Sequence, residues 1–115
     1  MPTIKIKRDF TTAPGPRYNS EGKNSGEQFR KEVLEPKVRQ ATESREALTV
    51  DLDGTSGYGT SFLEESFGGL IRESGFSLAQ LKSALRFKSN DEPELIDEIN
   101  EYMRDAEAAR LEGGK

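Results

Sequence analysis

Two aspartates at the end of an apolar stretch are the side chains best placed to do chemistry. Asp51 and Asp53 lie in the run VDLDGT at residues 50–55. Residues i and i+2 of a strand point to the same side, so the two carboxylates share one face directly before a glycine turn. Such a pair can work with Mg²⁺, one carboxylate attacking phosphorus and the other serving as acid or base. The residue types therefore permit metal-dependent phosphotransfer.

The run at residues 50–55 resembles the first signature of haloacid-dehalogenase-type phosphatases, which implies Asp51 as nucleophile, Asp53 as acid–base group and Mg²⁺ as cofactor. In that family the signature belongs to the first strand, whereas here 49 residues precede it. The chemistry also requires a later lysine and a second acidic pair. Lys88 fits the first role, but Asp91 and Glu92 are typical of helix capping. We favour a structural interpretation, in which Asp51 faces solvent and Asp53 caps the glycine turn, and keep the enzyme as the alternative.

The composition removes most other site chemistry. The 115 residues contain no cysteine and no histidine, which excludes Cys/His zinc sites, disulfides and histidine-activated nucleophiles. The 17 basic and 21 acidic residues give a net charge of −4, and no basic cluster offers a surface to nucleic acid. No apolar run approaches the ~20 residues of a membrane helix, and no secretion signal is visible. We expect a cytoplasmic protein without a cofactor, a nucleic-acid partner or a membrane contact.

The distribution of apolar residues indicates a folded chain. Hydrophobic residues make up 32% and charged residues 33%, a balance that also occurs in disordered proteins. Here, however, the apolar residues fall in periodic clusters, which predicts one modest core. We therefore predict a single domain over residues 1–115, with a long loop at 11–26 and a flexible tail at 110–115.

The N-terminal part predicts a strand followed by that loop. Ile4 and Ile6 alternate with lysines, which is typical of an amphipathic strand over residues 3–10. Residues 11–26 are rich in proline and glycine, and a loop of that length in a small domain is either functional or loosely ordered. A helix begins after it, because Ser25 and Gln28 form a capping box.

Pro36 lies inside the apolar pattern of this first helix, and we expect it to kink the helix or to end its first segment near Leu34. A second strand is predicted at residues 47–53. A second long helix then begins at a capping box of Ser61 and Glu64.

Glycine and capping residues divide the remaining chain. Gly75 is expected to stop the second long helix, and Ser77 begins a short one by capping it with Gln80. A third strand is predicted at residues 84–88, and Asp91 with Glu94 is expected to cap the last helix.

Strands that alternate with capped helices predict an α/β sandwich with right-handed crossovers. We expect a short mixed sheet whose helices pack mainly on one face. Because the strands alternate rather than being apolar throughout, the other face should be partly solvated.

A larger part of the chain resembles a second family. The matching segments are Asp9-Phe10, Pro14–Tyr18, Ser25–Arg30, Val50–Gly54 and Gly57–Leu70. Together they resemble a STAS-like family catalogued as a domain of unknown function and distantly related to anti-sigma-factor antagonists, over roughly residues 3–105. The resemblance implies a STAS-like domain that serves as a non-enzymatic regulatory module and binds a protein partner.

The same resemblance implies a phosphorylation switch at Ser61, with Thr60 beside it. In the antagonists, a partner that is both kinase and anti-sigma factor phosphorylates a serine at the start of this helix, and the complex then breaks. The implied partner is a histidine-kinase-like ATPase or an anti-sigma factor. The sequence departs from the antagonist pattern at Gly59, where they have an aspartate, and at Phe62, where they have a glycine. The structural alternative is that Ser61 caps the helix by accepting the N–H of Glu64.

Two places offer candidate contacts for a partner. Arg17 and Tyr18 are residue types that anchor interfaces, although Tyr18 could instead fold over the core. The second place is the loop and helix start at Gly57, Tyr58, Gly59, Glu64 and Glu65. A third function class, a small-ligand sensor, has only Gly57 and Gly59 as a phosphate-binding signal.

Overall fold

The computed structural model of the chain describes residues 2–113. Its elements in chain order are β1 (Thr3–Lys5), α1 (Ile6–Asp9), a 3-10 turn (Asn19–Glu21), α2 (Gly26–Phe29), a first π-helical segment (Arg30–Leu34), α3 (Glu35–Ser44), β2 (Leu48–Asp51), α4 (Thr60–Leu63), a second π-helical segment (Glu64–Gly68), α5 (Gly69–Arg72), α6 (Leu78–Ala84), β3 (Leu85–Lys88) and α7 (Glu94–Gly113). Consecutive elements join into two long helical runs, residues 26–44 and 60–72.

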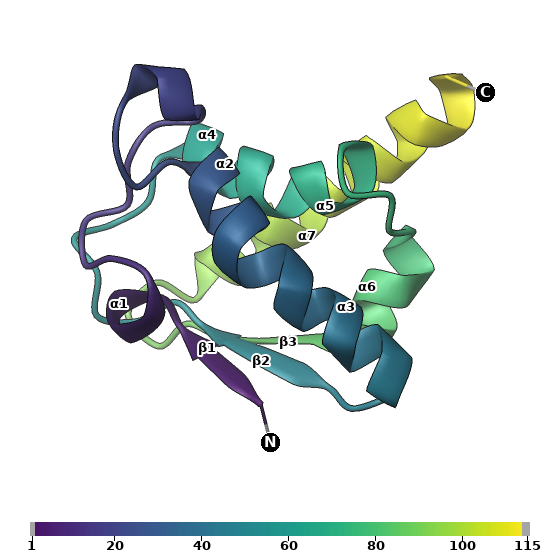
Figure 1. The fold of residues 1–115 in the computed structure, drawn as a ribbon, viewed down its shortest axis with the longest axis horizontal. Coiled ribbons are helices and arrows are strands. Elements are labelled where there is room, and N and C mark those ends of the chain that lie inside the picture. The colour runs from purple at the N-terminus through teal and green to yellow at the C-terminus, as the bar shows by residue number, and fades with distance from the viewer. Residues whose placement is uncertain (1, 114–115) are drawn as a thin grey trace.

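The sheet consists of three parallel strands in the order β1-β2-β3. The predicted α/β class is confirmed, whereas the predicted mixture of parallel and antiparallel pairs is wrong. Each strand returns through a helical crossover, so it runs in the same direction as the strand before it. The first crossover leads from β1 to β2 and the second from β2 to β3, so both move in the same direction across the sheet. Right-handed crossovers of this kind place their helices on one face. Figure 1 shows the helices on that face.

The two faces of the sheet differ in polarity, as the alternating pattern predicts. Ile4 is paired with Val50, and both side chains are fully buried on the face that the helices cover. The next row of paired residues, Lys5, Asp51 and Lys88, points to the opposite face. The helices therefore need to cover only one side of the sheet.

The first strand is shorter than the predicted residues 3–10. β1 ends at Lys5, and the chain then forms the helical turn α1. The carboxylate of Asp9 accepts the N–H of Lys5 at 2.9 Å, and the N–H of Phe10 donates to the carbonyl of Ile6 at 2.9 Å. These local hydrogen bonds favour a turn over an extended chain, and Ile6 still enters the core.

Pro36 changes the helix type without ending the helical run. Ser25 caps the run as predicted, because its Oγ accepts the N–H of Gln28 at 3.0 Å. In place of the return bond of the predicted box, Gln28 Oε1 accepts the N–H of Asn24 at 3.1 Å. The first π-helical segment ends at Leu34, which confirms a boundary there. Pro36 follows as the second residue of α3, inside the continuous run, so its missing N–H removes one helical hydrogen bond where the π-helical segment gives way to α-helix.

The signals around residue 75 are confirmed. α5 ends at Arg72, and Gly75 has a φ of 88°, a left-handed conformation that favours glycine. Ser77 and Gln80 form the predicted capping box, with donor–acceptor distances of 2.9 and 3.1 Å.

The predictions for the last helix are wrong in two respects. Asp91 does not cap it: its carboxylate accepts the N–H of Gly54 at 3.0 Å, and its own N–H donates to Asp53 at 2.8 Å. α7 also continues to Gly113, so the predicted tail is helical at residues 110–113. Residues 114 and 115 lie outside the described part of the chain.

The core lies between the covered face of the sheet and the helices. Its aromatic centre consists of Phe29, Phe62 and Phe67, all 0% exposed. Because Phe29 belongs to the first helical run and the other two to the second, their contact joins the two runs. The ring centroid of Phe29 lies 5.8 Å from that of Phe62 and 6.4 Å from that of Phe67. Among residues 2–113, no helix is both long enough and apolar enough to cross a membrane.

Candidate functional site

The loop before the second helical run is held by one tyrosine. The Tyr58 hydroxyl donates to the carbonyl of Leu52 at 2.8 Å, and its ring lies 5.9 Å from that of Phe62. Burial raises the pKa of Tyr58 to about 12, against the opposing hydrogen bond with Thr55, so the hydroxyl keeps its proton. The side chain is partly buried and packs against the core.

The two glycines of this loop leave open space around the backbone. Gly57 has a φ of 121°, which strains any other residue, and a Cβ built at either Gly57 or Gly59 would meet no atom within 4 Å. Gly59 is the N-cap of α4, and its position has no side-chain cap.

Thr60 and Ser61 form the first turn of α4, and both are exposed. The predicted capping box of Ser61 and Glu64 is therefore wrong, because the N-cap is Gly59, two residues earlier, and Ser61 lies inside the helix. Phe62 turns into the core and is 0% exposed, so its bulk does not cover Ser61. The two hydroxyls thus lie on an open surface at the start of the second helical run.

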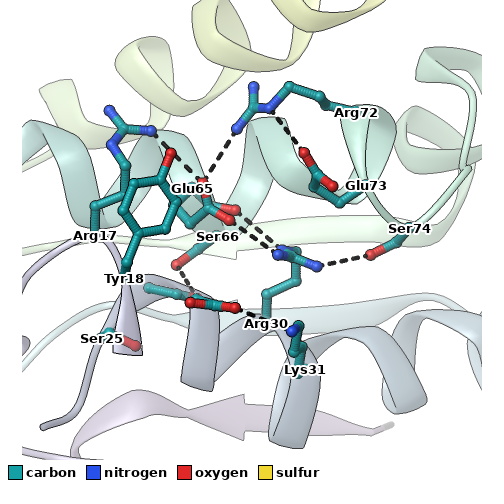
Figure 2. A network of polar contacts seen from close by, with 12 residues as sticks. Arg17, Tyr18, Ser25, Arg30, Lys31, Glu65, Ser66, Arg72, Glu73 and Ser74 are labelled. Atoms are coloured by element: carbon teal, nitrogen blue, oxygen red, sulfur yellow. Dashed lines mark hydrogen bonds and ion pairs between the residues drawn. The ribbon is translucent and has the colours of Figure 1, made fainter. Parts of the chain in front are cut away.

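The next turn of the same run carries the main polar cluster. Three arginines from different elements surround Glu64 and Glu65: Arg17 from the long loop, Arg30 from the first π-helical segment and Arg72 from α5. We call these five residues the arginine–glutamate network. Figure 2 shows the three arginines around Glu65.

The centre of the network is a buried ion pair. Arg30 Nη2 lies 2.9 Å from Glu65 Oε2, and each side chain is only 4% exposed. Arg30 also donates from Nε to the carbonyl of Glu65 at 3.3 Å and from Nη1 to Ser74 at 3.4 Å. Arg30 lies in the first π-helical segment and Glu65 in the second. Short π-helical segments of this kind occur often at functional sites.

The outer part of the network joins Glu64 to two arginines. Arg72 donates to both carboxylate oxygens of Glu64, at 2.7 and 3.1 Å, and Arg17 donates to Oε1 in a short contact. Burial works to raise the pKa of Glu64, but hydrogen bonds from Arg72 and Arg17 outweigh it and bring the pKa below its usual value. The same hydrogen bonds raise the pKa of Arg17 and Arg72.

The long loop that carries Arg17 is ordered by backbone hydrogen bonds. The N–H of Gly15 donates to the carbonyl of Asn24 at 2.9 Å, and the N–H of Gly26 donates to Pro16 at 2.9 Å. Gly26 also lies against the second run, where a Cβ would come within 2.6 Å of the carbonyl of Phe62. The loop is thus fixed at the junction of the two helical runs.

Tyr18 lies on the outer side of this loop. Its side chain is 46% exposed, and the guanidinium of Arg17 lies 5.8 Å from its ring centroid. The structure therefore brings Arg17, Glu64 and Glu65 together, while Tyr18 remains open to solvent.

Sequence reasoning missed Arg30 and Arg72. A signal for Arg30 was present, because Gly26, Arg30 and Leu34 recur every four residues and share one helix face, and all three are buried. A charged residue at a core position of an amphipathic helix indicates a buried partner of opposite charge. Nothing in the local sequence singled out Arg72.

The two aspartates at the end of β2 are bound by backbone groups. Asp51 Oδ1 accepts the N–H of Asp53 at 3.0 Å, and Asp53 Oδ1 accepts the N–H of Asp91 at 2.8 Å. The predicted roles of both aspartates are wrong. Asp51 is not solvent-facing but 6% exposed, and its carboxylate, rather than that of Asp53, caps the turn. Asp53 accepts instead from the distant Asp91. Lys88 Nζ lies 3.8 Å from Asp51 Oδ2. Within residues 2–113, no three acidic side chains form a group that could hold a metal ion.

The fold and this site define a small α/β domain with an all-parallel sheet and helices on one face. The model of the STAS-like domain of unknown function (DUF4325) matches residues 25–95, so the chain belongs to that family. Comparison with curated proteins and with solved structures gives no match. The matched range includes Thr60, Ser61 and four members of the network, whereas Arg17 and Tyr18 precede it.

Proposed function

We propose that this domain is a non-enzymatic regulatory module that binds another protein through the start of its second helical run. The observation that carries the proposal is the exposure of Thr60 and Ser61 beside a loop whose glycines leave the surface open. Exposed Tyr18 lies on the neighbouring loop and supplies the kind of aromatic anchor that interfaces use. By resemblance to the anti-sigma-factor antagonists, the partner is a histidine-kinase-like ATPase or an anti-sigma factor.

The switch that we propose is phosphorylation of Ser61 or Thr60 by that partner. The hydroxyl oxygen attacks the γ-phosphorus of a nucleoside triphosphate held by the partner, the bond to the β-phosphate oxygen breaks, and the nucleoside diphosphate leaves. The hydroxyl proton passes to a base of the kinase. The new phosphate carries about −1.5 to −2 charge at pH 7, which repels an acidic or apolar partner surface.

The test is capture of partners with the tagged full chain from its native host, followed by mass spectrometry of bound proteins and of phosphorylated peptides. The proposal expects an ATPase or sigma-pathway protein and phosphate on Ser61 or Thr60. Ser61→Glu should weaken capture, whereas Ser83→Glu, at an exposed serine on α6, should leave it unchanged.

Two other outcomes separate the parts of the proposal. A specific partner without phosphate would keep the interaction module and remove the switch. Absence of any partner for a folded sample would contradict the proposal and direct attention to a metal titration of Asp51 and Asp53.

A further inference from the structure

Arg17 binds the two carboxylates that follow Ser61 by one helical turn. Its Nη1 donates to Glu64 Oε1 and lies 3.6 Å from Glu65 Oε1, so the guanidinium sits between the two carboxylates. Ser61 precedes Glu64 by three residues and Glu65 by four, and such residues are neighbours on one side of a helix. Figure 2 shows Arg17 and Arg72 on opposite sides of Glu65. Because Arg72 follows Glu65 in the helical run, Arg17 approaches from the side of the turn that carries Ser61.

Arg17 is also the arginine that can leave the network without stranding a charge. If it moves, Glu64 keeps both of its hydrogen bonds with Arg72, and Glu65 keeps Arg30 at 2.9 Å and Arg72 at 3.3 Å. Loss of Arg30, by contrast, would strip Glu65 of its buried partner. The side chain of Arg17 is 28% exposed, so solvent and new ligands can reach it.

We propose that Arg17 responds to phosphorylation of Ser61 by exchanging its carboxylate partner for the new phosphate. The inference rests on the proposed function, because it takes Ser61 as the phosphoacceptor. Arginine and phosphate form charge-assisted, often bidentate hydrogen bonds, and the phosphate carries more charge than the carboxylate that it replaces. Glu64 and Glu65 oppose the phosphate, and Arg72 and Arg30 offset them.

The exchange has a route to the interface. The carbonyl of Arg17 accepts the N–H of Glu27 at 3.0 Å, and its guanidinium contacts the ring of exposed Tyr18. A guanidinium that turns toward Ser61 therefore changes the support of the neighbouring aromatic anchor. Phosphorylation then alters the partner surface in two ways, by adding charge and by moving Tyr18.

The experiment uses the full chain with phosphoserine incorporated at position 61 during translation, so that no kinase or partner is needed. The second pKa of the phosphate is measured by ³¹P NMR; a free phosphoserine has a value of about 6. We expect Arg17→Gln to raise that pKa by at least about half a unit, because it removes a cation from the phosphate. Arg39→Gln, which removes an arginine paired with Glu35 on α3, should leave it unchanged.

Arg17→Lys separates charge from geometry. We expect it to restore part of the lowered pKa, since lysine keeps the positive charge but loses the bidentate contact. Equal phosphate pKa values in the unchanged chain and Arg17→Gln would overturn the inference.

The same samples separate this inference from the proposed function. If phosphoserine 61 weakens partner capture but Arg17→Gln leaves the phosphate pKa unchanged, the proposed function stands and the inference fails. If the pKa depends on Arg17 while capture is unaffected, the contact is real and the proposed switch fails.

Discussion

Two pairs of carboxylates, Asp51 with Asp53 and Glu64 with Glu65, serve this molecule in different ways. The aspartates close the end of β2 and accept N–H groups of the backbone nearby in space. The glutamates accept hydrogen bonds from arginines of the long loop, the first helical run and α5. One pair stabilises turns, while the other joins three separate parts of the chain.

This difference shows that the partner, rather than the acidic residue itself, decides what a carboxylate contributes. A backbone N–H needs an acceptor and is satisfied by a neutral amide oxygen as well as by a carboxylate. A buried guanidinium needs a negative charge. The aspartates match a phosphatase signature by sequence, whereas the glutamates match no catalytic signature and bind three arginines in an ion-pair network.

The strongest test of this comparison is replacement of a carboxylate by the amide of the same shape. Glu65→Gln should lower the free energy of unfolding by about 3 kcal/mol, because it leaves Arg30 buried without a counter-charge. Urea unfolding followed by circular dichroism measures this loss. Glu73→Gln is the control, because the Glu73 side chain is 54% exposed and lies 3.6 Å from Arg72.

A loss below about 1 kcal/mol for Glu65→Gln would mean that the buried charge is dispensable. The double variant Arg30→Met with Glu65→Met should then be compared, since an apolar pair of similar volume often recovers the stability of a broken ion pair.

The second test concerns the close approach that aligns the network. Gly26→Ala should lower the free energy of unfolding by about 1–3 kcal/mol, because its Cβ must push the carbonyl of Phe62 away. Gly59→Ala is the matched control, with open space at its Cβ and an ordinary φ of −76°. Thermal unfolding of both variants measures the difference. Equal effects would show that the two helical runs are not tightly joined at Gly26.

The third test addresses the aspartates. Asp51→Ala should cost about 1 kcal/mol through the lost acceptor for the N–H of Asp53, and Asp51→Asn should recover most of it. Urea unfolding measures both. We also expect no Mg²⁺-dependent hydrolysis of p-nitrophenyl phosphate, and a metal-dependent rate abolished by Asp51→Asn would reverse the comparison in favour of the enzyme.

The smallest expected effect is the pH dependence of Glu64. Its folded pKa lies below the usual 4.5, so the stabilisation is present above that value and is lost as pH falls through the folded pKa. Arg72→Gln should reduce this loss of stability in acid, which is measured as the change in the urea midpoint between about pH 5 and about pH 3. Lys82→Gln, at an exposed lysine on α6, should not reduce it.

The sequence predicts much of the fold because its signals are local. The caps at Ser25 and Ser77 and the stop at Gly75 depend on residues within a few positions, and all three are confirmed. The predicted length of β1 is wrong because the helical turn at Asp9 depends on one side-chain hydrogen bond, which the alternation of apolar and polar residues does not reveal. The all-parallel sheet follows from the crossovers and not from the strand residues.

The site was harder to predict than the fold because its contacts are distant in the chain. Arg17 and Glu65 attract attention individually as residue types, but no spacing rule joins a loop arginine to a helix turn. Arg72 resembles an ordinary charged position of an amphipathic helix, and the core spacing of Arg30 does not say which carboxylate is its partner. The place of Ser61 inside the helix rather than at its cap reflects a shift of two residues, which capping preferences do not resolve.

The parallel register of the sheet has a consequence for how the chain folds. Thr3 pairs with Thr49 and Leu48 pairs with Leu85, so no strand finds its partner in a neighbouring hairpin. The loop-closure entropy of each pairing must be met before its hydrogen bonds form, whereas the helical runs form from local contacts. We therefore expect the pairing of distant strands, rather than helix formation, to limit the rate of folding.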